Sequence, residues 1–571
     1  MTGKSRKILI VALVLGTVLA AIKLIFADYT LDEEYQLMMG YRTLSGDHLF
    51  REMWEPHQTS AFLCTGLMWL YRTITGTYTG LLLYLRVCTT LIQVLLSLYV
   101  YKVLSKLVEK EYAALCGSLY FNMVPKIIQV PEFSNMQLWF FTLLVLPLIQ
   151  YYMSEEKART GRRYLLILAG LAMALEVLSY PSCLILFPFF LGYIMVASKK
   201  GRWVDGALFA GTCAICAAVW LGIVLLHVDW PEFLQNVDYM LNFDLTHDIS
   251  GATEGKFAGI LRNIAGGMGL LAITAVVSGI VWLCVRKKVS LQDKKDAVLP
   301  ISVIAVCVAG VIQLVYWVIL KSGYEVYQFH LLVVLIAGMI AWRYAGASKK
   351  MLFAGIVGTL LSYVAVIYIS DLEMFYALAH GVLGVIFCAV VLTMALRQKL
   401  GDGGRKWIVI LLVALCFISI AGKGYTLREG RNYNVIADSR GIMKYGPAIG
   451  VVSDYMNCYI YNCNYEDFIE NVSSEDTVLI VANMVFSEST TPYMITECNV
   501  AHYSIVDPTA YDERLLTYWA LYPEKEPDVI VVDCWYGQLQ EKTDSWIMQY
   551  IENEFGYTQV TDGRYVRFYR K

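Results

Sequence analysis

The sequence predicts a polytopic α-helical membrane protein with a small α/β domain after its last span. Of its 571 residues, 57% are apolar and 16% are charged, whereas soluble domains have roughly 45–50% apolar and about 25% charged residues. Apolar runs are long and uninterrupted up to about residue 424, and short β-rich runs alternate with helix-like segments beyond it. We therefore expect a transmembrane domain over residues 1–424 and an α/β domain over residues 425–571.

The first apolar run follows the basic stretch MTGKSRK, as in a signal peptide. Residues 8–26 are long enough to span a bilayer and no A-x-A cleavage site closes the run, so we expect an uncleaved first helix. With the later runs this gives about 13 transmembrane helices. The later runs are residues 80–104, 112–128, 136–152, 164–178, 182–197, 204–226, 262–285, 297–320, 330–342, 351–370, 376–396 and 407–421.

Residues 59–75 decide the predicted topology, because their apolar core is about half of the ~20 residues that a spanning helix needs. If this segment only dips into the membrane or lies along its surface, the Lys and Arg clusters of the short loops fall on the cytoplasmic side, as positive-inside loops should. We therefore expect a cytoplasmic N-terminus, outer loops at residues 27–79 and 227–261, and an extracytoplasmic α/β domain. No obvious sorting signal is present, and we expect a bacterial plasma membrane.

Two outer segments have helical periodicity. Trp230, Leu234 and Val237 recur at helical spacing after an Asp-Trp-Pro-Glu start signal, and Leu31 and Tyr35 begin a weaker pattern. Such helices suit a loop that handles a lipid-borne substrate, and equally suit a cover over the bundle.

The last domain shows β-rich runs at residues 477–482, 528–533 and 564–568, with helix-like segments at 465–470, 514–521 and 543–555. This alternation predicts a partly parallel sheet. Neither a GxGxxG nor a P-loop follows the strands.

Charge and cysteine usage exclude some classes of function. A net charge of −2 offers no basic surface for nucleic acid. Most of the 14 cysteines lie in or beside apolar spans, where a thiol acts as a small hydrophobe. A disulfide between Cys458 and Cys463 and a pair of free thiols are both compatible with their spacing, and no CxxC metal motif occurs.

The outer segment at residues 27–61 holds the densest set of ionisable groups. Its acids and imidazoles are Asp28, Asp32, Glu33, Glu34, Asp47, Glu52, Glu55, His48 and His57. Thr30-Leu-Asp32-Glu33 forms a capping box, which by itself explains both acids structurally. The positive end of a helix also keeps a carboxylate ionised, as a general base must be. We take Asp32 and Glu33 as catalytic candidates, of which one at most faces the reacting atom.

Further polar residues on the outer side are candidate substrate ligands. Arg51 could bind a phosphate or pair with a neighbouring acid, and His57 could act in the site or serve as a structural hydrogen bonder. Acids at the mouth of a bundle are costly unless they are paired or functional. The candidates are Arg51, Glu55, His57, Lys126, Glu132, Asn135, Lys321 and Tyr324. For Arg86 and Glu176, inside spans, we expect pairing across helices or snorkelling.

Together these motifs resemble the C-superfold (GT-C) membrane glycosyltransferases, in the family 39-like branch of protein mannosyltransferases and aminoarabinose transferases. The resemblance rests on an acidic pair followed by Tyr (Asp32-Glu33-Glu34-Tyr35), a Gly-Asp at Gly46-Asp47, a Pro-His turn at Pro56-His57, Arg86, and Pro131-Glu132. Glu132 stands where the family usually has Asp, and Pro56-His57 replaces the usual His-Pro-Pro.

The resemblance implies an inverting transferase that takes a sugar from a polyprenyl phosphate on the outer face. Asp32 would receive the proton of the acceptor, and Glu33 would be its neighbour. The implied partners are the lipid-linked donor, an acceptor in the cell envelope (protein, lipid or polysaccharide) and membrane lipid. A divalent cation is optional, and no His cluster argues for zinc.

Other functions remain open from the sequence. A multi-pass transporter or flippase of lipid-linked sugars would be expected to show internal repeats and polar residues at mid-membrane, which are not evident. An assembly protein whose outer domain does the work, and a lipid-linked oligosaccharide polymerase or ligase, are further alternatives.

Overall fold

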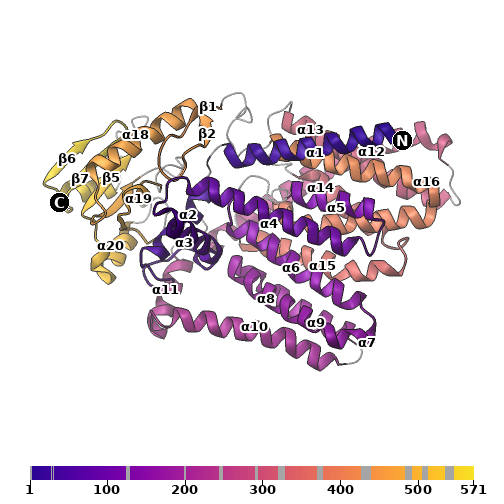
Figure 1. Ribbon diagram of the computed structural model, residues 1–571, viewed down its shortest axis with the longest axis horizontal. Helices are drawn as coiled ribbons and strands as arrows, with labels where there is room; N and C mark the ends of the chain where they lie inside the picture. Colours follow the sequence, from indigo (N-terminus) through magenta and orange to yellow (C-terminus); the bar gives the residue numbers. More distant parts are fainter. Residues whose placement is uncertain are drawn as a thin grey trace.

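A helical bundle forms one end of the molecule and a mixed β-sheet the other, with α2 (Leu31–Leu44), α3 (Phe62–Thr75) and α11 (Trp230–Asn242) between them (Figure 1). This arrangement comes from a computed structural model. It describes residues 3–27, 29, 31–123, 129–198, 201–242, 249–289, 294–318, 328–369, 374, 377–425, 439–481, 491–503, 512–533 and 546–571.

Each predicted span has a helical counterpart. These are α1 (Gly3–Phe26), α4 (Leu81–Leu104), α5 (Lys110–Met123), α6 (Phe133–Met153), α8 (Tyr164–Ser179), η3 (Pro181–Ile185) with α9 (Leu186–Ala197), α10 (Arg202–Val224), α12 (Ile249–Val285), α13 (Val298–Val318), α14 (Phe329–Ala341), α15 (Phe353–Ile369) and α16 (Val382–Tyr425). In the described part of the chain, 8 helices are long and apolar enough to cross a membrane, and two shorter segments are also apolar. The chain is a multi-pass membrane protein, and the crossing number of about 13 stays a prediction.

The last two predicted spans lie in α16, where two helices are joined across a kink. Gly401 near its middle adopts φ 52° and ψ −126°, a backbone conformation that glycine tolerates and other residues avoid. The break lies in the polar stretch between the two apolar halves, where the sequence predicted a loop.

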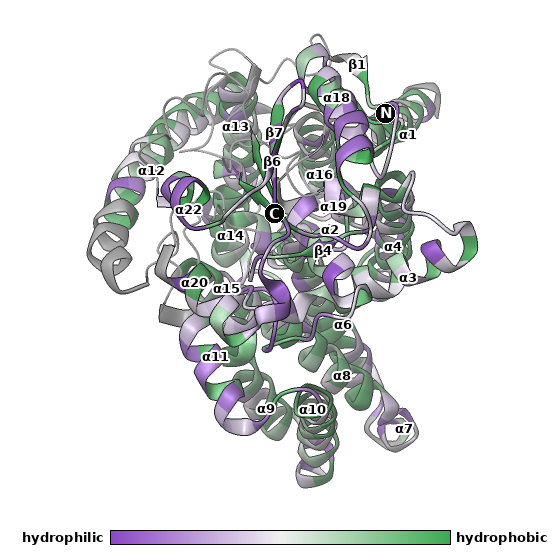
Figure 2. Ribbon diagram, turned by 90° about the vertical axis from the view of Figure 1, so that its left-hand side faces the viewer, coloured by the Kyte–Doolittle hydropathy of each residue, from purple (hydrophilic) through white to green (hydrophobic). Residues whose placement is uncertain are grey.

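The bundle buries large apolar side chains in its interior and also exposes apolar side chains on its outer surface. Val11, Leu15 and Ile22 lie along one side of α1 and are exposed, as expected for side chains that face lipid. Hydrophobic residues follow the bundle helices, whereas α11, α18 (Tyr455–Asn471) and α22 (Trp546–Asn553) carry hydrophilic ones (Figure 2).

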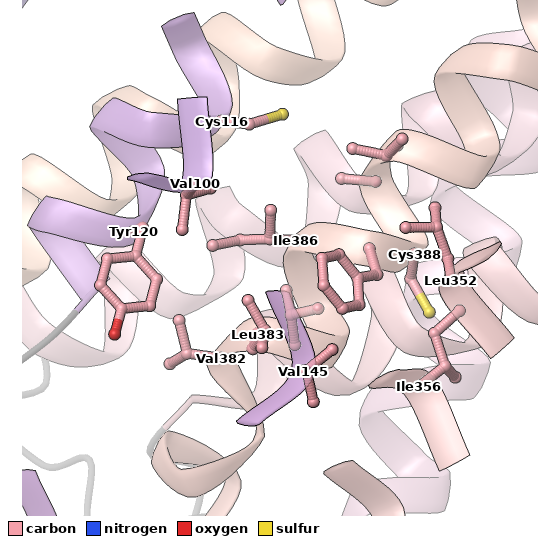
Figure 3. Packing of buried hydrophobic residues seen from close by; sticks show 14 of the residues in the cluster. Val100, Cys116, Tyr120, Val145, Leu352, Ile356, Val382, Leu383, Ile386 and Cys388 are labelled. Carbon is pink, nitrogen blue, oxygen red and sulfur yellow. The ribbon is translucent and has the colours of Figure 1, made fainter. Parts of the chain in front are cut away.

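The centre of the bundle is filled by side chains from α4, α5, α6, α15 and α16. Val145, Leu383 and Ile386 are among those that interdigitate there (Figure 3). Gly338 lets α14 approach α16 closely, since a Cβ at this position would lie 2.3 Å from the Cβ of Cys388. Small residues at helix contacts are the usual means of close packing in membranes.

The segment at residues 27–79, predicted as an outer loop, is mostly helical. α2 follows α1 after a short connection, and α3 has 14 residues, too few to span a bilayer. Cys64 and Met68 on α3 are buried against α2, whereas Trp69 and Ile74 are exposed. α3 therefore has one packed side and one apolar side open to its surroundings, as a surface helix should have.

The C-terminal sheet is partly parallel, as predicted. Its strand order is β4-β3-β5-β7-β6, in which β3 pairs in parallel with β4 and β5, and β7 pairs antiparallel with β5 and β6. The strands are β3 (Thr477–Val481), β4 (Asn499–Val500), β5 (Val529–Asp533), β6 (Gln559–Asp562) and β7 (Val566–Arg570). The helices α18, α19 (Thr491–Thr496), α20 (Asp512–Leu521) and α22 accompany it. Cys458 and Cys463 form no disulfide, and Cys534 lies outside the described residues.

Candidate functional site

A buried ion pair joins the start of α2 to the membrane bundle. Arg86 of α4 donates from Nε to Glu33 Oε1 at 2.9 Å and from Nη2 to Oε2 at 2.6 Å. Its Nη1 also donates to the backbone oxygen of Ile25, near the end of α1, at 2.9 Å. The Arg86 guanidinium thus holds together the end of α1, the first turn of α2 and the N-terminal part of α4. Pairing, rather than snorkelling, accounts for Arg86 in its span.

Asp32 is the second residue of α2, next to the paired Glu33. Its backbone lies in the first turn, where unpaired N–H groups and the helix dipole favour a negative charge. The side chain of Asp32, together with Asp28 and Thr30, lies outside the described residues. Its role as a base therefore stays a prediction.

A second ion cluster joins α2 and the segment after it to the sheet domain. Arg42 Nε donates to Asp47 Oδ2 at 2.7 Å, and Lys525 pairs with the other oxygen of Asp47. Tyr518 donates to the backbone oxygen of Glu52 at 2.9 Å. Burial alone would raise the pKa of Asp47, but the charges of Arg42 and Lys525 outweigh it and hold this pKa below its usual value. Asp47 is consequently a structural anion.

Arg51 and Glu55 border this cluster. Arg51 Nη1 lies 2.9 Å from Glu52 Oε1, so Arg51 pairs with a neighbouring acid, one of the two roles expected for it. Its side chain is 38% exposed. Glu55 is fully buried, and its charge adds to that of Asp47 in raising the pKa of Arg42 against the opposing effect of burial.

His57 belongs to a group of aromatic rings at the mouth of the bundle. Its ring stacks on Phe133, with centroids 4.1 Å apart and planes at 4°. Tyr35 meets both rings edge-on, and Tyr180 is tilted towards them. We call Tyr35, His57, Phe133 and Tyr180 the aromatic group. It joins α2, the segment before η1 (Gln58–Ala61), the start of α6 and the turn after α8.

Glu132 is the N-cap of α6. Its two carboxylate oxygens accept from the backbone nitrogens of Ser134 and Asn135, each at 2.6 Å. The Asn135 side chain in turn donates to the backbone oxygen of Val130 at 2.9 Å. Both predicted ligands therefore shape the turn at residues 129–135, and Gln129 N approaches Glu33 Oε1 at 3.4 Å.

These contacts divide the predicted site residues into two sets. One set centres on residues 129–135, which include Glu132 and Asn135 and contact Glu33 and His57. The other set is Arg51 and Glu55, which lie with the ion cluster around Arg42. Lys126, Lys321 and Tyr324 lie outside the described residues. Within the described residues, no three or more His, Cys, Asp or Glu side chains are grouped to hold a metal ion.

Below the aromatic group lies a buried polar network that the sequence did not reveal. Gln137 Nε2 donates to Glu176 Oε1 at 3.2 Å and to Ser362 Oγ at 2.8 Å, and Gln137 Oε1 lies 2.9 Å from His380 Nδ1. The His380 ring meets Tyr180 edge-on. Because Gln137 is 225 residues from Ser362 and 243 from His380, no local pattern could have connected them.

Some solved structures are similar to the chain, but no protein-family model and no curated protein matches it. The archaeal oligosaccharyltransferase AglB from Archaeoglobus fulgidus, in complex with an inhibitory peptide and a dolichol-phosphate, has 12% identity and a TM-score of 0.46, covering 96% of this chain and 71% of that one. ArnT from Cupriavidus metallidurans in the apo state has 13% identity and a TM-score of 0.44, covering 100% and 98%. ArnT bound to undecaprenyl phosphate has 12% identity and a TM-score of 0.43 over the same shares. Similarity at this level does not by itself establish a function.

Proposed function

We propose that this chain is an inverting glycosyltransferase that moves a sugar from a polyprenyl-phosphate-linked donor to an acceptor on the extracytoplasmic face of the membrane. Asp32 is the proposed general base. The acceptor oxygen or nitrogen forms a bond to the anomeric carbon while the bond from that carbon to the phosphate breaks. The acceptor proton passes to Asp32, and the lipid phosphate leaves with the electron pair of the broken bond.

The observation that carries this proposal is the clamp made by Arg86. Arg86 forms an ion pair with Glu33 and a hydrogen bond to the end of α1. The first turn of α2 is therefore fixed at the ends of the membrane helices α1 and α4. Asp32 belongs to that turn. A lipid-borne sugar is confined to the same interface as Asp32. Donor binding therefore brings the sugar next to the base without a further diffusion step.

The chemistry demands little of the leaving group. A polyprenyl phosphate is stable as an anion, so it needs a cationic or hydroxyl cradle more than a general acid. Arg51, Lys126, Lys321 and Tyr324 are the proposed cradle, because such side chains suit phosphate oxygens. We propose that the sugar or the acceptor contacts three further residues. These are His57, in the aromatic group, and Glu132 and Asn135, beside the ion pair of Glu33 with Arg86.

The proposal requires the acidic segment to face away from the cytosol. Ser45, at the end of α2, is exposed, whereas Asp47 is buried and unsuitable for labelling. A Ser45→Cys variant, in a Cys284→Ser/Cys534→Ser background, should react with a membrane-impermeant maleimide added to intact cells, whereas the same background without the new cysteine should not. Labelling only after the cells are opened would place the segment in the cytosol and exclude the proposal.

The direct test is transfer by the purified full-length protein in detergent. A panel of radiolabelled polyprenyl-phosphate sugars is offered with membrane fractions as acceptors, and one or more should lose label to protein, lipid or wall polymer. Detergent removes every ion gradient, so transfer under these conditions also excludes a transporter. Donor binding that depends on a gradient, without transfer, would favour the transporter and contradict the enzyme.

A further inference from the structure

A small hairpin of the outer domain lies on the ends of two membrane helices. Its strands are β1 (Ser439–Ile442) and β2 (Val452–Asp454), and Ile442 pairs with Val452. Val452 also bridges Ala27, directly after α1. The hairpin is thereby fixed at the end of the first span.

The turn of the hairpin lies on the start of α4. Gly80 N donates to Gly446 O at 3.0 Å, and Leu82 N donates to Pro447 O at 3.1 Å. Gly446 has φ 61°, a left-handed conformation that favours glycine, and it lies close to Tyr461, since a Cβ there would be 3.0 Å from Tyr461 Oη. The hairpin is thus held at the C-terminal end of α1 and at the N-terminal end of α4.

The hairpin and the first two turns of α18 expose apolar and aromatic side chains. Ile442 is 49% exposed, and Tyr455 and Tyr459 at the start of α18 are 61% and 43% exposed. The rings of Tyr455 and Tyr459 stack with planes at 8°. We call Ile442, Tyr445, Tyr455, Met456 and Tyr459, all of which are exposed, the hairpin foot.

Three observations favour lipid as the occupant of the hairpin foot. First, it continues the apolar side of α1, since Phe26 is exposed directly before the bridge between Ala27 and Val452. Second, tyrosine, which has an apolar ring and a polar hydroxyl, is enriched at the level of lipid headgroups. Third, the hairpin carries the exposed Lys444, which suits anionic headgroups, and the one acid between residues 442 and 459, Asp454, accepts from Asn457 N as the N-cap of α18.

The position of the foot agrees with this chemistry. Viewed from the side of the sheet domain, β1 and α18 lie at the margin of the molecule beside α1 rather than over the middle of the bundle (Figure 2). In Figure 1, α18 begins next to β2 and extends away from the bundle. Its last turn is therefore farther from the bundle than its first turn.

We propose that the hairpin foot is a membrane-contact surface that rests the outer domain on the lipid headgroups beside α1. A patch of this kind facing water would be an unexplained apolar exposure. On lipid, its tyrosine hydroxyls and Lys444 reach the headgroups while Ile442 and Met456 enter the apolar layer.

The test is photo-crosslinking of the full-length protein in phospholipid nanodiscs. Tyr455→p-benzoylphenylalanine and, in a second variant, Tyr459→p-benzoylphenylalanine are irradiated and analysed by mass spectrometry. Phospholipid adducts should form at both positions, in clear excess over a matched control on the same helix. The control is Ile469→p-benzoylphenylalanine, which is 52% exposed but 14 residues from Tyr455, or about 21 Å along the helix.

The same experiment can overturn the proposal. Adducts to a protein or to an added glycan, without lipid, would assign the foot to another partner. Lipid adducts that are equally frequent at residues 455 and 469 would show non-specific contact. Absence of adducts at both 455 and 459, in nanodiscs whose protein is shown to be folded by its melting curve, would leave the foot in water. Each of these results contradicts a membrane-contact surface.

Discussion

Arg86 and Glu33 face each other in a two-point ion pair at the junction of α4 and α2, with N···O distances of 2.9 and 2.6 Å. Both side chains are at most 2% exposed. The pair separates the roles of two adjacent acids, because Glu33 is committed to the fold while its neighbour Asp32 remains the proposed base. This difference can be measured.

We expect Glu33→Gln and Arg86→Gln to destabilise the protein by about 3–5 kcal/mol each, because each leaves one buried charge without its partner. The double variant Glu33→Gln/Arg86→Gln should lose much less than the sum of the two single losses, since neither charge then remains. Melting temperatures in detergent give the comparison. Single variants that melt like the wild type would show that the pair contributes little to the fold.

Glu132 should prove to be both a helix cap and a ligand. Glu132→Ala removes the acceptor for two backbone N–H groups and should cost about 0.5–2 kcal/mol. Glu132→Asp should restore the melting temperature, because aspartate is a good N-cap, yet raise KM for the lipid-linked donor, since its carboxylate is withdrawn by one methylene. An Asp variant with unchanged KM would reduce Glu132 to a cap.

His502 should make the sheet domain sensitive to acid. Burial, reinforced by the charge of Arg42, lowers the pKa of His502 to about 3. An unfolded histidine titrates near pH 6.5, so only the unfolded state gains a proton between these values. Stability is therefore complete above pH ~6.5 and falls by up to about 1.4 kcal/mol per pH unit below it.

Amide hydrogen exchange on β5, corrected for the intrinsic effect of pH, measures this dependence. His502→Gln removes the titrating group and should flatten the curve between pH 6.5 and 5. If the stability of the wild type changes with pH by the same amount as that of the variant, His502 is not buried as a neutral ring.

The sequence predicted the features that depend on local pattern. Each apolar run became a helix, and the short apolar core at residues 61–70 correctly indicated a helix too short to span. The β-rich runs beginning at residues 477 and 528 became adjacent parallel strands, because continuous apolar strands flanked by helices are typical of such sheets.

Contacts between distant segments were not predictable in this way. Lys525 meets Asp47 across 478 residues, and both would be read from the sequence as ordinary solvated charges. The partners of Gln137 could not be predicted either, because they come from three other elements. By contrast, the cap formed by Glu132 had a readable signal, since an acid directly before an apolar helix is a common N-terminus.

The measurement that tests the central claim most directly is the rate of sugar transfer by Asp32→Asn, with Glu33→Gln as the comparison. The account predicts that Asp32→Asn melts like the wild type but loses transfer from every polyprenyl-phosphate sugar that the wild type uses. Glu33→Gln, in contrast, should have a lower melting temperature than the wild type. Wild-type transfer rates in a well-folded Asp32→Asn protein would contradict the assignment of Asp32 as the base.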